Sequence, residues 1–189
     1  MQIIDNSINK IALKLQEKQN LDYLDFLRVR LGIQLVVMNL SKAIVTYGLA
    51  LLVNTFLYTL IAHLSYVLLK QVSFGAHAKN SILCHVQNII FFVAVPWLIV
   101  KYEIPFLFML LLSILGWLIV VKYAPAATRK LPIKSSRKRG FKIKSIIVIT
   151  ALIVIACVIP SPYQQLVTYG ITLQSISLLP IFFNKEEFV

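Results

Sequence analysis

Acidic residues are scarce in this chain of 189 residues, which contains seven aspartates and glutamates against 19 lysines and arginines. Charged residues make up only 14% of the chain, whereas soluble domains contain about 25%. Cysteine is scarce as well, with Cys84 and Cys157 far apart in the sequence. This spacing excludes a disulfide-rich framework and the usual zinc motifs, so we expect two lone thiols, no metal and no other cofactor.

Apolar residues fill most of the chain, with 59% hydrophobic residues and a mean hydropathy of +0.82. A membrane core of about 30 Å takes about 20 helical residues to cross. The long uncharged runs are 43–69, 82–100, 104–121, 145–160 and 163–183. The sequence therefore predicts an all-α, polytopic integral membrane protein of about four to six membrane helices plus an N-terminal amphipathic helix. No cleavable signal peptide is apparent, so the internal runs are expected to direct insertion.

Residues 1–42 are predicted to form an N-terminal amphipathic segment, and residues 43–189 the membrane core. Apolar side chains recur at the spacing of one helix face, at Ile4, Ile8, Ile11 and Leu15. Asn20 breaks this pattern, and Asp22 is suited to cap a second helical piece. A helix that lies on an anionic leaflet and a helix that packs on its own domain explain the pattern equally well.

Residues 122–144 are strongly basic, with nine lysines and arginines and no acid. The positive-inside rule predicts that this loop is cytoplasmic and that Cys84 lies near the cytoplasmic face. Helix breakers are expected within the loop at Pro125, Pro132 and Gly140.

Residues 1–42 are also weakly basic, which conflicts with a single crossing by 43–69. Either that run is broken or re-entrant, or residues 31–42 join it to make two short spans across 31–69.

A polar interruption at residues 70–81 separates the first two apolar runs and places His77 seven residues before Cys84. A cap at Asn80 or Ser81 puts Cys84 in the first turn of a helix, and a helix N-terminus or a nearby positive charge lowers the pKa of a thiol. On one unbroken helix, seven residues span about 10.5 Å, so a hydrogen-bonded Cys–His pair requires the chain to turn between them.

Two interpretations of Cys84 have equal weight on these grounds: a nucleophile with His77 as its base, or a small apolar residue in a helix. Cys157, between Ala156 and Val158, fits the second interpretation. The basic loop favours binding of anionic lipid headgroups over docking of an acidic peptide. Nucleic acid is excluded, because the loop has no recognition motif and few aromatic residues. A small transporter using His63, His77 and Lys79, and a scaffold that recruits an acidic partner, are alternative functions.

Four stretches together resemble the accessory gene regulator B (AgrB) family of staphylococcal type. The first is Gly75-Ala76-His77-Ala78 with Ser81 and Cys84, and the others are residues 28–34, 123–130 and 178–183. The resemblance implies a membrane cysteine endopeptidase of quorum sensing. Members of this family cut a short AgrD-type precursor peptide on the C-terminal side of the future signal, and the precursor then cyclises to a thiolactone autoinducing peptide.

Carried onto this sequence, the resemblance implies Cys84 as the nucleophile that forms an acyl thioester and His77 as the general base. Gln34 is a candidate donor to an oxyanion, with Ser81 and Gly75 in support. Arg129, Lys130 and Lys70 are candidates for binding the precursor, and Lys70 stands where staphylococcal members have arginine, which weakens a bidentate contact. The implied partners are a precursor with an acidic C-terminal tail, the lipid bilayer and a second copy of the chain. The implied location is the cell membrane, with the active site facing the cytoplasm.

Overall fold

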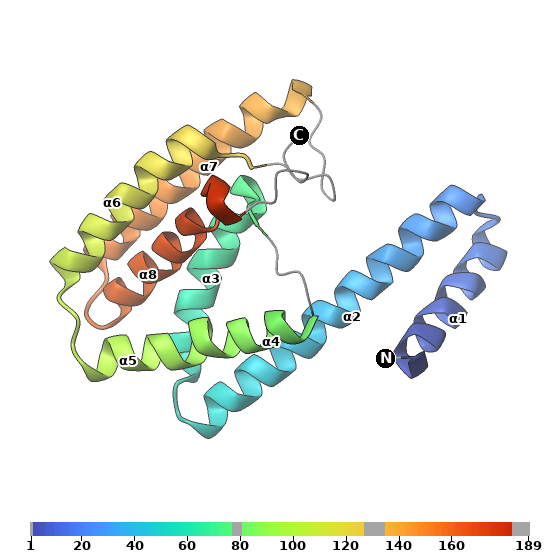
Figure 1. The fold of residues 1–189 in the computed structure, drawn as a ribbon, viewed down its shortest axis with the longest axis horizontal. Helices are drawn as coiled ribbons and strands as arrows, with labels where there is room; N and C mark the ends of the chain where they lie inside the picture. The colour runs from blue at the N-terminus through green and yellow to red at the C-terminus, as the bar shows by residue number, and fades with distance from the viewer. Residues whose placement is uncertain (1, 77–80, 127–134, 183–189) are drawn as a thin grey trace. The chain divides into compact units, whose positions relative to one another are not determined.

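The computed structural model describes residues 2–76, 81–126 and 135–182, and its secondary structure over these ranges is helical, without a strand (Figure 1). The chain divides into two compact units, Met1–Gly48 and Leu49–Val189. Helices long and apolar enough to cross a membrane lie at Tyr23–Leu52, Leu83–Lys101, Phe106–Tyr123 and Ser136–Val158. The prediction of an all-α polytopic membrane protein is confirmed.

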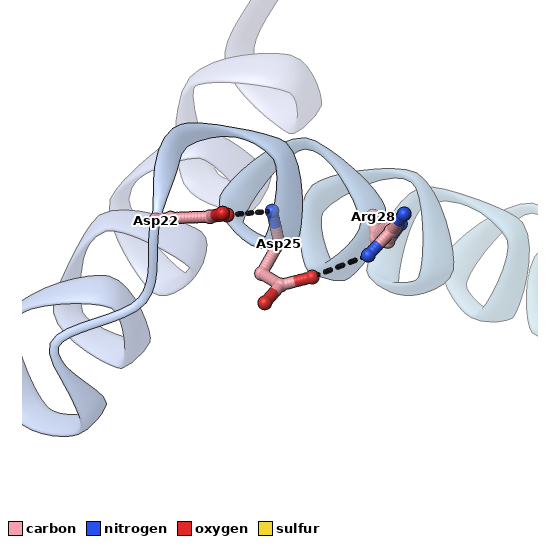
Figure 2. A network of polar contacts seen from close by, with 3 residues as sticks. All are labelled: Asp22, Asp25 and Arg28. Atoms are coloured by element: carbon pink, nitrogen blue, oxygen red, sulfur yellow. Dashed lines mark hydrogen bonds and ion pairs between the residues drawn. The ribbon is translucent and has the colours of Figure 1, made fainter.

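The first unit contains α1 (Gln2–Gln19) and most of α2 (Tyr23–Leu52). Asn20, at which the amphipathic pattern breaks, has a left-handed φ of 47°, a conformation that asparagine tolerates better than most residues. Figure 2 shows the start of α2, where the Asp22 carboxylate accepts a hydrogen bond from the Asp25 backbone N–H at 2.7 Å. Asp25 in turn forms an exposed ion pair with Arg28 at 2.6 Å. The predicted cap at Asp22 is confirmed, since its oxygen satisfies a first-turn N–H.

The run 43–69 is not one span. The helix α2 ends at Leu52, and α3 (Phe56–Ser73) begins four residues later. Between them Asn54 has a φ of 56°, and the Thr55 N–H donates to the Ala50 carbonyl oxygen at 2.8 Å. The run is therefore broken at 53–55, as one predicted alternative has it, and residues 31–42 belong to the helix before the break. Of these two helices, α2 is long and apolar enough to cross a membrane, so two short spans across 31–69 stay a prediction. The polar Asn54 supplies the left-handed residue at which the helix is interrupted.

The second apolar run forms one helical segment built from α4 (Ser81–Ile89), a π-helical turn η1 (Ile90–Ala94) and α5 (Val95–Lys101). Because of Pro96, the Phe91 carbonyl in this turn needs a hydrogen-bond donor from another helix. The Val95 N–H donates to the Ile90 carbonyl, as in a π-helix, and Pro96 has no N–H to offer the next carbonyl, that of Phe91. The Tyr169 hydroxyl donates to that Phe91 oxygen at 2.9 Å. A side chain from a distant helix therefore replaces the bond that the proline cannot make.

Two further runs form α6 (Phe106–Tyr123) and α7 (Ser135–Val158). The start of α6 after Pro105 agrees with the sequence. The prediction that Gly140 breaks a helix is wrong, because α7 begins at Ser135 and continues through it. A glycine inside a helix costs only about 1 kcal/mol, which the packing of the following turns, with Ser145 and Ile149 fully buried, offsets. Pro132 lies outside the described residues.

The run 163–183 is not a full membrane span either, because α8 (Tyr163–Ile176) has 14 residues and ends before a short 3-10 turn, η2 (Pro180–Phe182). At 1.5 Å per residue, α8 is about 21 Å long. It packs against α3, α6 and α7 (Figure 1) and buries polar side chains along its length, including Gln165, Thr168, Gln174 and Ser175. The sequence prediction fails here because α8 is surrounded by protein, where polar groups find partners that lipid does not provide.

Small residues allow α3 and α8 to approach closely. A side-chain carbon added at Gly170 of α8 would overlap the Ser65 hydroxyl oxygen and lie 2.5 Å from the Ala62 carbonyl oxygen of α3. Gly116 of α6 meets Ser175 of α8 in the same way, at 2.8 Å. Helices within membranes associate through such small-residue contacts, because lipid supplies no hydrophobic force between them.

We expect Gly170→Ala to destabilise the protein by about 1–3 kcal/mol, because the added methyl group meets the backbone of α3 and cannot be relieved by a rotamer change. Thermal unfolding of the full chain in lipid nanodiscs measures the effect. The matched control is Gly140→Ala, since a side-chain carbon there has no heavy atom within 4 Å. This control should leave stability unchanged or raise it by up to about 1 kcal/mol. Equal melting temperatures for the two variants would contradict the close approach of α3 and α8.

Candidate active site

Cys84 lies on α4, four residues into the helix, and is half-buried. The first-turn N–H groups of a helix have no partner within the helix and, with the helix dipole, favour a negative charge beside them. The position agrees with the predicted first-turn cysteine. α4 begins at Ser81, and Asn80 lies outside the described residues, so the predicted cap at Asn80 or Ser81 stays a prediction. Cys157, by contrast, is exposed on α7.

His77 also lies outside the described residues, as does the stretch 77–80 in which the sequence predicts a turn. The pairing of His77 with Cys84 therefore stays a prediction. The structure does describe the chain up to Ala76, the residue directly before His77.

The approach to His77 is a short loop, residues 73–76, in which two successive residues have positive φ values: Phe74 at 63° and Gly75 at 115°. We call this segment the 73–76 loop. Its Gly75 N–H donates to the Ala126 carbonyl oxygen at 3.4 Å, and the Ala126 N–H donates to the Ser73 carbonyl at 3.0 Å. The Ala76 N–H donates to the Ser177 carbonyl at 3.0 Å. Backbone from the ends of α6 and α8 thus holds the loop from both sides.

Gln174, fully buried in the last turn of α8, adds side-chain bonds to the same loop. Its Nε2 donates to the Ser73 hydroxyl at 2.9 Å and to the Phe74 carbonyl at 2.5 Å. The Ser177 hydroxyl donates to the Gln174 backbone carbonyl at 2.7 Å and also lies within hydrogen-bond distance of Gln174 Oε1, at 3.0 Å. The residues Ser73, Phe74, Gln174 and Ser177 with these bonds are called the Gln174 clamp below.

Gly75 has a steric as well as a conformational reason for lacking a side chain. A carbon added there would lie 2.7 Å from the Ser177 hydroxyl and 3.3 Å from Gln174 Nε2, inside the Gln174 clamp. Its φ of 115° is also one that other residues rarely adopt. The supporting role predicted for Gly75 stays a prediction, but the structure supplies a physical basis for it.

Lys70, in the last turn of α3, also contacts the 73–76 loop. Its ammonium donates to the Tyr66 hydroxyl at 2.8 Å and to the Ala76 carbonyl at 3.2 Å. An ammonium has three donors, so these two bonds leave capacity for an anionic ligand. Binding of precursor by Lys70 stays a prediction.

The other predicted site residues are not brought together by the structure. Gln34 is half-buried on α2 and belongs to the first unit, whereas Cys84 belongs to the second. Arg129 and Lys130, and the side chain of Ser81, lie outside the described residues. His63 packs between aromatic rings, 4.5 Å from the centroid of Phe92 and 6.5 Å from that of Tyr66. The amphipathic role of residues 1–42 and the homodimer stay predictions.

The described part of the basic loop begins α7 as a run of exposed cations: Arg137, Lys138, Arg139, Lys142 and Lys144. Among them, Phe141 places its ring 5.1 Å from that of Phe74, edge to face. The start of the basic helix therefore lies next to the 73–76 loop, which connects to His77.

Sequence reasoning did not find Gln174, Ser177 or Tyr169. A signal for Gln174 was present, since an amide in an apolar stretch must find partners when it is buried, but the sequence could not say which partners. The signal for Tyr169 was Pro96, which leaves a carbonyl without its N–H. Within the described ranges, no group of three or more histidines, cysteines and acids is placed to hold a metal.

The fold and the site define a polytopic helical membrane protein with a lone thiol in the first turn of a membrane helix. Residues 8–178 match the family described as Accessory gene regulator B. The chain is 62% identical to Accessory gene regulator protein B of Staphylococcus intermedius and 51% identical to that of Staphylococcus haemolyticus, over 99% of this chain and 100% of each relative. A Staphylococcus aureus protein of the same name is 46% identical, again over 99% of this chain and 100% of the relative. The chain belongs to the accessory gene regulator B family, which is a membrane family with a part in accessory gene regulator quorum sensing. No solved structure matches it.

Proposed function

We propose that this protein is a membrane cysteine endopeptidase that cleaves an AgrD-type quorum-sensing precursor and supports its cyclisation to a thiolactone autoinducing peptide. The observation that carries the proposal is the position of Cys84 in the first turn of α4, in a chain of this family. A thiolate is the nucleophilic form of cysteine, and a helix N-terminus is a place where proteins stabilise an anion. His77 is assigned as the base on the family resemblance, and hydrogen bonds hold the backbone of the 73–76 loop up to Ala76, the residue before it.

The reaction has two balanced steps. In the first, Cys84 sulfur attacks the carbonyl carbon of the scissile peptide bond, and the released amine takes the proton that His77 removed from the thiol. The N-terminal part of the precursor remains on Cys84 as a thioester. In the second step, His77 takes the proton of a precursor cysteine thiol, and that sulfur attacks the thioester carbonyl carbon. The thiolactone forms, and Cys84 leaves as a thiolate beside the protonated His77. Because one thioester replaces another, this step is nearly balanced in free energy. The main task of the site is therefore to exclude water, which would hydrolyse the thioester.

Oxyanion stabilisation in the first step has two candidate sources. First-turn N–H groups, which have no partner within their own helix, are donors of the kind that bind a developing oxyanion, and α4 supplies such a first turn at Cys84. Gln34 is the second candidate, as a side-chain amide.

We expect Cys84→Ser and His77→Ala each to abolish precursor cleavage, by about 10³-fold or more, because they remove the nucleophile and its base. Co-expression of each variant with the precursor, followed by mass spectrometry of the products, measures cleavage. The control is Cys157→Ser, which removes the exposed thiol of α7 and should process the precursor normally. Membrane insertion of every variant is checked by fractionation. Normal processing by Cys84→Ala would exclude the peptidase and leave the transporter or scaffold.

The proposed active site faces the cytoplasm. The contact between Phe74 and Phe141 supports a position on the same side of the membrane for the 73–76 loop and the basic start of α7. Lysine and arginine next to a membrane span favour the cytoplasmic side. The turn after Lys101, between α5 and α6, lies at the other end of α6 and belongs on the opposite side.

A single cysteine at Ser136, which is exposed and uncharged, should react with a membrane-impermeant maleimide in inside-out vesicles and not in intact cells. The background is Cys84→Ser with Cys157→Ser. The matched control is Tyr102→Cys at the exposed opposite turn, which should show the reverse pattern. Labelling of Ser136→Cys from outside intact cells would show that the cytoplasmic assignment is wrong.

The basic loop is proposed to dock the acidic C-terminal tail of the precursor. Exposed cations on α7 from Arg137 to Lys144 support this assignment, and Arg129 and Lys130 are the residues that the family resemblance favours. Lysine and arginine near a membrane also attract anionic headgroups, so a test must remove that contribution.

We expect the double variant Arg129→Gln/Lys130→Gln to weaken precursor binding by roughly 3- to 10-fold at low ionic strength, with a smaller difference at high salt, because exposed ion pairs are weak and screened. Binding is measured by fluorescence anisotropy of a labelled precursor, with Cys84→Ser protein in nanodiscs of uncharged lipid. Lys101→Gln is the matched control, since Lys101 is an exposed cation near the opposite turn. Equal binding by the double variant and the control would rule out docking at Arg129 and Lys130.

A further inference from the structure

We infer that Gln174 is a positioning residue for the proposed peptidase, which holds the 73–76 loop in the conformation that presents His77. The inference rests on the proposed function for its catalytic consequence. Its geometric basis is the Gln174 clamp, which joins the end of α3 to the end of α8 across 101 positions of the sequence.

The amide of Gln174 has one orientation that satisfies its neighbours. The Phe74 carbonyl can only accept a hydrogen bond, so Nε2 must face it at 2.5 Å. The Ser73 hydroxyl donates to the Leu69 carbonyl at 2.8 Å, which leaves its oxygen to accept from Nε2. The single proton of the Ser177 hydroxyl is shared between the Gln174 backbone carbonyl at 2.7 Å and Oε1 at 3.0 Å, so the orientation rests on the Phe74 and Ser73 partners. Reversing the amide would set Oε1 against the Phe74 oxygen, so these partners fix the side chain.

The bond to Phe74 matters because that residue is in a conformation that it would not adopt alone. Phe74 has a φ of 63° and a ψ of −131°, a region that non-glycine residues sparsely populate and that costs about 1–3 kcal/mol. Strained backbone persists only where surrounding structure holds it. Gln174 bonds the Phe74 carbonyl itself, and this peptide unit sets the direction in which Gly75 and Ala76 leave α3. His77 follows directly, so release of this peptide unit moves the proposed base.

Gln174 and Gln165 are both buried glutamines of α8, but their side chains bond different parts of the protein. Gln165, near the first turn of the same helix, donates to the Ile104 carbonyl at 3.4 Å and to the Ser161 hydroxyl at 3.2 Å. Both residues are buried glutamines on α8, but one faces the 73–76 loop and the other faces the turn before α6. Gln165 Oε1 has no hydrogen-bond partner, so the two residues are not identical in bonding, but Gln165 still serves as the control for loss of a buried amide on α8 away from the 73–76 loop.

The experiment compares Gln174→Met with Gln165→Met in the full chain, in lipid nanodiscs with a synthetic precursor. Methionine conserves the length and approximate volume of glutamine and removes its hydrogen bonds. We expect Gln174→Met to lower kcat by about 10- to 100-fold, because a displacement of about 1 Å in a catalytic group can cost 10²-fold, and to change KM by less than about twofold. Gln165→Met should keep kcat within about threefold of the wild type.

A second readout does not require turnover. In a Cys157→Ser background, the rate of alkylation of Cys84 by iodoacetamide is followed as a function of pH. Gln174→Met should shift this profile toward that of His77→Ala, and Gln165→Met should not, because only the first is expected to disturb the base that assists the thiol. Thermal unfolding of each variant checks that the protein remains folded.

Ser73→Ala provides an internal check on the mechanism. It removes one acceptor of the Gln174 clamp, and the double variant Ser73→Ala/Gln174→Met should be no slower than Gln174→Met alone, since the two residues act through one hydrogen-bonded group.

Three outcomes are distinguishable. Wild-type protein that does not cleave the precursor defeats the proposed function itself. Wild-type cleavage with an unchanged kcat and alkylation profile in folded Gln174→Met overturns the positioning role and leaves the proposed function intact. Equal losses of kcat in Gln174→Met and Gln165→Met also overturn it, because they would show that any buried amide of α8 is needed for the fold alone.

Discussion

The structure depends on the requirement that polar groups removed from water find partners inside the protein. This requirement has great weight in a chain with few charges and long apolar helices, because lipid offers no hydrogen bonds; among the described residues, Thr59 Oγ1 and Gln165 Oε1 are buried without a partner. It is met at two places where the helical ladder fails. At η1 the Phe91 carbonyl, to which Pro96 cannot donate, accepts a hydrogen bond from the Tyr169 hydroxyl. At the end of α3 the Phe74 carbonyl accepts a hydrogen bond from Gln174 Nε2. Both partners come from α8, which is the polar centre of the second unit.

The central position of α8 explains its unusual composition. It is too short to span the hydrocarbon core, and it is rich in glutamine, threonine and serine, yet it packs against α3, α6 and α7. Glycine at positions 116 and 170 allows the helices to approach closely enough for such short polar side chains to reach partners. The apolar helices around it can face lipid, and exposed leucine and isoleucine on α6 and α7 agree with that arrangement.

The same interactions link the proposed catalytic and binding elements. The 73–76 loop precedes His77, and it is bonded to the end of α6, from which the chain continues toward Arg129. Its Phe74 ring also contacts Phe141 in the basic start of α7. The segment that presents the proposed base and the segment that is proposed to bind the precursor tail therefore share one packed junction. Such a junction suits an enzyme that must align a peptide across both.

Local sequence signals determined the helices, the cap at Asp22, the break at Asn20 and the first-turn position of Cys84, because periodicity, caps and left-handed residues act within a few positions of the chain. They also singled out Gly75. They failed at Gly140, where packing outweighs a small helix penalty, and at residues 163–183, where an uncharged run is a buried core helix instead of a span. Only the tertiary structure decided the partners of Gln174 and Tyr169. Hydrogen bonds between residues 101 or 78 positions apart depend on how helices pack, and a sequence pattern does not specify that.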